Sequence, residues 1–120
     1  MKGERHITKT EDYGLVYGKG RTWTSQLVVM KSLPTERNLS RYGLSVSRRV
    51  GKAVVRNRVK RLLREILRQV SLSPGWDIIF IARSAAANTN YHSLEESVRN
   101  LLLRAGLLVR EHEESCSGVD

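Results

Sequence analysis

Residues 42–67 read YGLSVSRRVGKAVVRNRVKRLLREIL and hold a strand pattern, a basic loop and a helix pattern in direct succession. Apolar residues at positions 42, 44 and 46 alternate with glycine and serine, which indicates a half-buried strand. From Val55 to Val70 apolar residues recur at steps of three and four, as on one face of an amphipathic helix. We therefore predict a strand, a loop interrupted by Gly51, and a helix over about residues 53–70.

The chain before this stretch predicts one helix and two strands. Thr8 and Glu11 have the spacing of a capping box, which favours a helix over about residues 10–18. Gly18 and Gly20 should end that helix. Two runs that favour β structure follow, at 21–24 and 27–33, and Pro34 should stop the second.

The chain after it predicts one strand and one helix. A Ser-Pro-Gly turn at 73–75 precedes the apolar run of a central strand over 76–82, and residues 83–89 are predicted to be a loop. Asn90 suits the N-cap of a last helix that Gly106 should close. This order predicts an α+β fold, an α/β sandwich in which helices cover a small mixed sheet of about four strands.

The length of 120 residues suits one domain, which we assign to residues 1–110. Residues 111–120 hold four acidic residues and no Lys or Arg, so we predict a disordered tail there. The formal net charge is +9, and it is +13 without that tail, which points to a polyanionic partner such as nucleic acid. With no apolar run of about 18 residues, no signal-like segment before Lys9 and only Cys116 as a thiol, we expect a cytoplasmic protein that does not bind a membrane.

The positive charge is concentrated between Lys31 and Val70, where twelve basic residues face only Glu36 and Glu65. At about 100° per residue, the apolar residues of the central helix occupy one face and its basic residues the other. Arg56 and Arg58 fall on opposite edges of the apolar face, so they should not contact the same phosphate. A solvated charged face is the alternative, but a single acid leaves few ion pairs for it.

Two other classes of nucleic-acid protein find little support in the sequence. An intrinsic nuclease needs a metal cluster, a carboxylate pair or an activated nucleophile, whereas the histidines at 6, 92 and 112 are far apart and Asp12 and Asp77 are isolated. A sequence-specific DNA binder of the helix-turn-helix type needs a partner helix at short spacing before the basic helix, and none is present.

The stretch at 42–67 resembles the signature of the bacterial ribonuclease P protein family. The resemblance is centred on Arg56-Asn57-Arg58 and includes the strand GLSVS, the Gly-Lys-Ala-Val step and the continuation RNRVKRLLRE. It extends over about residues 5–108, because residues 8–17 look like the family's first helix and residues 76–83 like the strand after its arginine-rich helix. The family fold implies a left-handed β-α-β crossover through that helix, opposite to the general rule.

The resemblance implies a protein cofactor of a ribozyme. Such a protein binds the ribonuclease P catalytic RNA and the 5′ leader of precursor tRNA, and it promotes the endonucleolytic cleavage that frees the mature 5′ end. The active site lies in the RNA, Mg²⁺ is held mainly by the RNA, and no small-molecule substrate is expected. The alternative is a ribosomal-protein-like or general RNA-binding chaperone without a role in cleavage.

The resemblance also assigns residues to two surfaces. The surface for the RNA subunit comprises the motif and its supporting cations, to which we add Arg48 and Arg49 from the position of the basic loop before the helix: Arg56, Asn57, Arg58, Lys60, Arg61, Arg64, Arg48, Arg49 and Lys52. The loop cations lie where free N–H groups of a helix start would help to bind an anion, although a simple basic turn is the alternative.

The second surface is a cleft for the leader, lined by Tyr13 and Tyr17 of the first helix and by Val28 and Met30 of a strand. Aromatic faces stack on bases of any sequence, which suits a leader that varies between tRNAs. Met30 stands where the family often carries an aromatic residue, so stacking there should be weaker. The alternative for both tyrosines is a place in the core, because they form one helical stripe with Val16.

Overall fold

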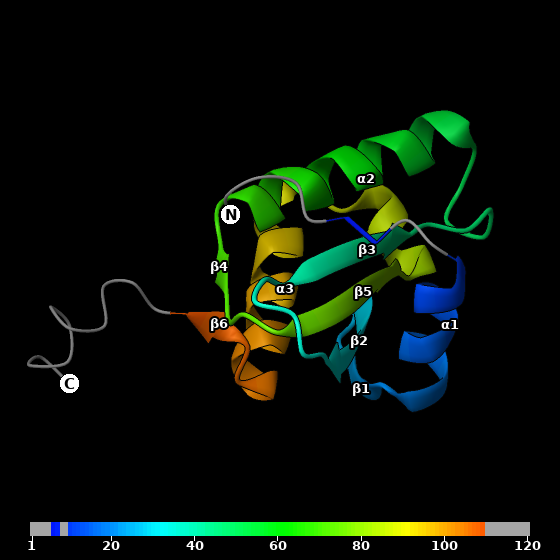
Figure 1. The fold of residues 1–120 in the computed structure, drawn as a ribbon. Coiled ribbons are helices and arrows are strands. Elements are labelled where there is room, and N and C mark those ends of the chain that lie inside the picture. Colours follow the sequence, from blue (N-terminus) through cyan, green and yellow to red (C-terminus); the bar gives the residue numbers. More distant parts are fainter. Residues whose placement is uncertain (1–5, 8–9, 110–120) are drawn as a thin grey trace, which may run out of the picture.

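The computed structural model describes residues 6–7 and 10–109, and it confirms the predicted α+β class. The elements follow the predicted order (Figure 1). They are α1 (Thr10–Lys19), β1 (Arg21–Thr24), β2 (Val28–Pro34), β3 (Arg41–Ser45), α2 (Ala53–Arg68), β4 (Ser71–Leu72), β5 (Trp76–Ala82), the 3₁₀ helix η1 (Ser84–Asn88), α3 (Tyr91–Ala105) and β6 (Leu108–Val109).

Four strands form the main sheet in the order β1-β2-β5-β3. The pairs β1–β2 and β2–β5 are antiparallel, whereas β3 and β5 are parallel and are connected through α2. This confirms the mixed sheet and the β-α-β crossover, and the left hand of the crossover stays an expectation. Strand β5 lies between two neighbours with its middle buried, which explains its continuous apolar run.

The sheet lies between two layers of helix. Helices α2 and α3 pack on one face, where Met30 and Phe80 are fully buried together with Leu63 and Leu101. Helix α1 packs on the other face, where Val16, Ile7 and Ile79 form a smaller cluster. Because side chains of a strand alternate between faces, adjacent residues of β5 belong to different clusters.

Both predicted ends of the last helix are confirmed. The Asn90 side chain accepts a hydrogen bond from the backbone N–H of Ser93 at 2.8 Å, and so caps the start of α3. Gly106 ends the helix in the left-handed conformation, with φ of 74°. The proposed capping box of the first helix involves Thr8, which lies outside the described residues, and α1 runs through Gly18 to Lys19.

Two local predictions were wrong. Residues 84–88 form η1 within the predicted loop, with i+3 hydrogen bonds such as that from the Ala86 N–H to the Arg83 carbonyl at 2.8 Å. Helix α2 ends at Arg68, two residues early, and the chain then pairs β4 with β6 in a second small sheet. Strands of two residues are too short to leave an alternating pattern in the sequence.

Candidate nucleic-acid interface

Helix α2 carries the basic surface, and its faces are divided as the projection predicts. Val59, Leu63, Ile66 and Leu67 are buried against the sheet and α3. Asn57, Arg61, Arg64 and Arg68 are exposed, whereas Arg56, Arg58 and Lys60 are partly buried along the margins. The apolar face fixes the helix on the core, so the cations project from a rigid element.

The two arginines of the motif are held on different sides of α2. Arg56 donates from Nε to the carbonyl of Gly51 at 3.2 Å, next to the start of its own helix. Arg58 donates from Nη2 to the carbonyl of Thr89 at 2.6 Å, next to the start of α3. The prediction that they border opposite edges of the apolar face is confirmed, and Asn57 lies exposed between them.

Most cations of α2 lack an acidic partner within the described part of the chain. The ion pair that α2 forms there joins Arg68 to Glu65 at 3.3 Å, and both side chains are about half exposed or more. Arg58, Lys60, Arg61 and Arg64 form no ion pair with a described acid. Like charges one turn apart destabilise a helix slightly, so this face gains stability when a polyanion neutralises it.

The loop before α2 adds three exposed cations, Arg48, Arg49 and Lys52. Lys52 is the N-cap residue of α2, its side chain forms no capping bond, and the first turn of the helix contains no acid. The free N–H groups and the helix dipole therefore add positive potential to that of the side chains. The structure brings these residues to the end of α2 that also carries Arg56.

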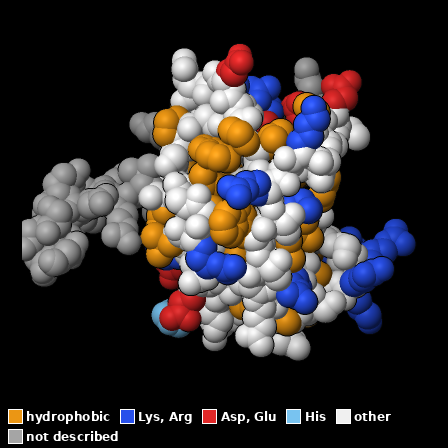
Figure 2. All heavy atoms as spheres, turned by 90° about the horizontal axis from the view of Figure 1, so that it is seen from below, with side chains coloured by type: hydrophobic (Ala, Val, Ile, Leu, Met, Phe, Trp, Pro, Cys, Tyr) orange, Lys and Arg blue, Asp and Glu red, His pale blue; other side chains and the backbone are white. Residues whose placement is uncertain are grey.

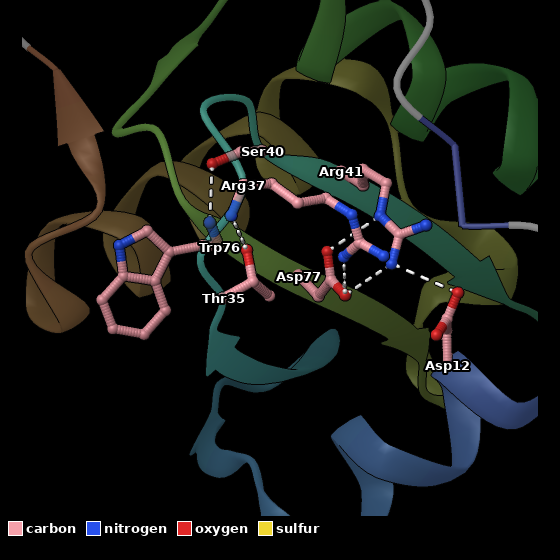
Figure 3. Close-up of polar contacts among 7 residues, drawn as sticks. All are labelled: Asp12, Thr35, Arg37, Ser40, Arg41, Trp76 and Asp77. Atoms are coloured by element: carbon pink, nitrogen blue, oxygen red, sulfur yellow. Dashed lines mark hydrogen bonds and ion pairs between the residues drawn. The ribbon is translucent and has the colours of Figure 1, made fainter.

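On the opposite face of the sheet, α1 is fixed by a network of charges around Asp77 (Figure 3). Asp77 is only 4% exposed and accepts two hydrogen bonds from Arg41, at 3.0 and 2.7 Å. Arg41 Nη2 also lies 3.3 Å from Asp12 Oδ2 of α1, and the more exposed Arg37 approaches Asp77 at 3.3 Å. The network therefore joins α1 to β3 and β5.

The two tyrosines of α1 differ in burial. Tyr13 is partly buried over β3, where a Cβ on Gly43 would lie 2.8 Å from its Cζ atom. Burial raises the pKa of Tyr13 above its ordinary value, the neighbouring Tyr17 adds to the rise, and a hydrogen bond with the Leu44 backbone opposes it. Tyr17 is 43% exposed. The core alternative therefore describes much of Tyr13, but it fails for Tyr17.

The assignment of Val28 and Met30 to the cleft was wrong. Both side chains are fully buried, and they lie in the cluster beneath α2 and α3, on the face away from α1. Met30 pairs with Phe80 of that cluster, so a leader on the α1 side cannot touch it. The concern that Met30 weakens stacking therefore disappears with the assignment.

The side chains of β2 that face α1 are those one position after Val28 and Met30. Val29 pairs with Ile81 and Lys31 with Ile79, and Ile79 packs against Val16 of α1. We call the incompletely buried part of this face the open sheet face. It consists of Thr22, Thr24, Val29, Lys31, Ser45 and Ile81. The sequence signal that could have found it is Lys31, because a lysine seldom points into a core.

The open sheet face combines apolar side chains with a cation. Lys31 lies across the strands and donates from Nζ to Thr22 Oγ1 at 2.8 Å. Figure 2, seen from the side opposite α2, shows hydrophobic side chains gathered in the middle of the surface with Lys and Arg among them. The acidic side chains in that view lie toward its rim. On the open sheet face, the apolar side chains of Val29 and Ile81 beside the Lys31 cation suit bases and a phosphate backbone together.

Within residues 6–7 and 10–109, no three His, Cys, Asp or Glu side chains gather as metal ligands would. Over the same residues, no helix is both long and apolar enough to cross a bilayer.

Comparison with known proteins identifies the family. The family model of ribonuclease P matches residues 1–106. The chain belongs to the ribonuclease P protein family. The ribonuclease P protein component of Dehalococcoides mccartyi is 45% identical over 120 residues, which is the whole of both chains. That of Roseiflexus castenholzii is 40% identical over 111 residues, covering 90% of this chain and 91% of the relative.

Solved ribonuclease P proteins have the same fold. The Staphylococcus aureus protein superimposes with a TM-score of 0.79 at 28% identity, covering 89% of this chain and 100% of that one. The Thermotoga maritima protein gives 0.74 at 28% identity, covering 82% and 96%. Membership of the family implies a role in tRNA 5′ processing as part of ribonuclease P, with a ribonuclease P RNA as partner.

Proposed function

We propose that this chain is the protein cofactor of a ribonuclease P ribozyme and acts in the cytoplasm. It binds the catalytic RNA through α2, and it holds the 5′ leader of precursor tRNA between α1 and the open sheet face. The observation that carries the proposal is the basic face of α2, whose arginines Arg56 and Arg58 are anchored on two sides and have no acidic partner among the described residues.

The contact with the RNA subunit follows from the chemistry of α2. A guanidinium that is held by one backbone carbonyl keeps further N–H donors for phosphate oxygens or base edges. Arg56 and Arg58 therefore reach separate parts of the RNA, with Asn57 between them. Lys60, Arg61 and Arg64 contribute phosphate contacts, and so do Arg48, Arg49 and Lys52 around the start of the helix.

The contact with the leader is supported by the open sheet face and by the exposed tyrosine of α1. Tyr17 offers an exposed aromatic ring for stacking, and Lys31 offers a charge for the backbone of a single strand. Val29 and Ile81 supply apolar surface between them. None of these groups distinguishes one base from another, which suits a leader of variable sequence. Tyr13 supports this surface by packing α1 onto Gly43.

In this proposal the catalytic groups belong to the RNA, and the RNA holds most of the Mg²⁺. The carboxylates of Asp12 and Asp77 are engaged by Arg41, so they are poor candidates for holding a catalytic metal ion. The protein contributes binding and orientation, which lower the concentration of Mg²⁺ that the ribozyme needs because protein cations replace some counterions.

Reconstitution tests the proposal. The purified chain, added to a prefolded bacterial ribonuclease P RNA at low Mg²⁺, should restore 5′ maturation of precursor tRNA, while the protein alone cleaves nothing. No stimulation would refute the cofactor role. A general RNA chaperone would act while the RNA folds and would give no stimulation with prefolded RNA, so the same assay separates the alternatives.

A further inference from the structure

A groove of about 850 Å³ lies outside both surfaces described above. Its walls are the turn between β1 and β2, the helix η1 and the outward side of α3. The lining residues are Ser25, Gln26, Leu27, Ala85, Asn88, Thr89, Ser93, Glu96, Ser97, Arg99, Asn100 and Leu103. Its volume falls within the range of sites that hold small ligands or parts of larger ones.

The groove is lined mainly by uncharged hydrogen-bonding groups. Amides and hydroxyls of Gln26, Asn88, Ser97 and Asn100 provide donors and acceptors without net charge. Such groups read the exposed edges of unpaired bases and the 2′-hydroxyls of RNA. The one acid, Glu96, has a side chain that is 72% exposed and pairs with His92 at 3.4 Å.

Three arginines frame the groove. Arg83 donates from Nη1 to the Ser25 carbonyl at 3.0 Å, and Arg104 donates from Nη1 to the Thr24 carbonyl at 3.0 Å. Arg83 follows β5 and Arg104 lies in the last turn of α3, and both side chains are exposed. Arg58 holds the wall at Thr89. The guanidinium groups of Arg83 and Arg104 keep further donors that suit phosphate oxygens at the rim of the groove.

The groove adjoins the open sheet face at the β1–β2 turn, at one end of the sheet. Thr24 of that face precedes Ser25 of the groove. The Arg83 N–H bonds to the Leu27 carbonyl at 2.9 Å, which extends the pairing of β5 with β2 one step beyond Val28 and Ala82. A strand of RNA that crosses Val29 and Ile81 therefore meets Arg83 and the turn next.

We propose that this groove is a distal subsite for the 5′ leader of precursor tRNA. Nucleotides upstream of those on the open sheet face enter it, place bases against Asn100 and Asn88, and place phosphates on Arg83 and Arg104. The inference rests on the proposed function, because it assigns the farther part of the same leader. It also accounts for the polar side chains that line most of this side of α3, beside the exposed Leu103.

The variant Asn100→Glu tests the subsite, with Asn38→Glu as a matched control. Asn100 is exposed on α3, and Glu favours a helix more than Asn does, so the fold should persist. The new carboxylate repels phosphate and can pair with Arg104 four residues on. Asn38 is also exposed, but it lies in the loop before β3, outside the groove and both RNA surfaces.

The readout is the affinity of the reconstituted holoenzyme for precursor tRNAs whose leaders are shortened one nucleotide at a time. As the leader lengthens, wild type should gain affinity in two stages. Asn100→Glu should lose only the stage given by the longest leaders, by about tenfold, as for the loss of one charge-assisted hydrogen bond. Asn38→Glu should behave as wild type. Ser97→Ala with Asn100→Ala should show a smaller loss of the same stage without any added charge.

Three results would overturn the subsite. They are a single stage of gain in wild type, an equal loss for Asn100→Glu at every leader length, and weaker binding of the RNA subunit without substrate, which would assign the groove to that RNA. If the proposed leader contact itself is wrong, the result differs. Affinity should then not depend on leader length, and Tyr17→Ala should not change it for any leader. A retained first stage with no second stage refutes the subsite alone.

Discussion

The guanidinium of Arg41 holds the buried carboxylate of Asp77 in a two-point contact, from Nε to Oδ1 at 3.0 Å and from Nη2 to Oδ2 at 2.7 Å (Figure 3). The same Nη2 lies 3.3 Å from Asp12 Oδ2, so one side chain of β3 connects β5 with α1. The tyrosines of α1 therefore depend on an ion pair beneath them for their position on the sheet.

Asp77→Asn should lower the free energy of unfolding, because it removes the charge that compensates Arg41. The site is largely buried, since the Arg41 side chain is 17% exposed and that of Asp77 is 5% exposed. Loss of one partner of a buried pair costs about 3–5 kcal/mol. Urea unfolding followed by circular dichroism measures the loss. Arg37→Ala, at a side chain that is 48% exposed, is the control and should cost less than about 1 kcal/mol. Equal losses would mean that Asp77 has no special contact with Arg41.

Gly43→Ala should displace α1, because the added Cβ meets the Tyr13 ring at 2.8 Å from Cζ. A forced contact of this kind costs about 1–3 kcal/mol. The double variant with Tyr13→Leu should recover part of the loss in a double-mutant cycle. Gly14→Ala has open space on the same helix and should instead stabilise the protein by about 0.5–1 kcal/mol. Additive effects in the cycle would contradict the contact.

Met30→Ala and Tyr17→Ala should affect different properties, the first the stability of the fold and the second the binding of the leader. Met30 is fully buried, so its truncation should cost about 2–5 kcal/mol of stability and leave the leader contact unchanged in the folded protein. Tyr17 is 43% exposed, so its truncation should leave the unfolding midpoint nearly unchanged. It should weaken leader binding by about 1–3 kcal/mol. A leader defect in Met30→Ala without instability would return Met30 to the cleft.

These two residues also show what the sequence predicts well and what it does not. It predicts the faces of a long amphipathic helix, but not which side of a sheet each side chain of an apolar strand faces. The amphipathic helix α2 was predictable, because charge and apolar residues separate cleanly over sixteen residues and place Arg56 and Arg58 on opposite edges. Strand β2 begins with Val28, Val29 and Met30, all apolar, so its period of two cannot be read. Its pairing with β5 decides which side chains face α1, and that pairing is tertiary information.

Features formed by distant segments were likewise invisible. The residues of the network around Arg41 are up to 65 positions apart, counted from Asp12 to Asp77, and Asp77 read alone is an isolated acid. The groove beside α3 combines a turn, η1 and a helix that no local pattern relates. Periodicity predicts elements and faces, whereas such sites depend on how the faces are assembled.

The titration of Tyr13 should report how α1 sits on the sheet. Burial raises its pKa above the ordinary value of 10.0, so the folded state keeps a proton that the unfolded state loses. The contribution of protonated Tyr13 to the stability of the fold is therefore fully present below about pH 10, and it is lost as the pH rises through the pKa of Tyr13 in the folded state. Tyr13→Phe should remove this loss. Tyr17→Phe should lower the pKa of Tyr13, as measured by ultraviolet titration of tyrosinate, and no change would place the two phenols apart.

Arg58→Ala should weaken binding of the ribonuclease P RNA more than Arg68→Ala does. Arg58 is fixed to the Thr89 carbonyl at 2.6 Å and presents its remaining donors in one orientation, so its loss should cost about 1–3 kcal/mol. Arg68 is 62% exposed and shares its charge with Glu65, so its removal should cost little. Filter binding at several salt concentrations measures both, and Arg58→Lys separates charge from geometry. Equal effects for the two alanine variants would reduce the motif to bulk charge.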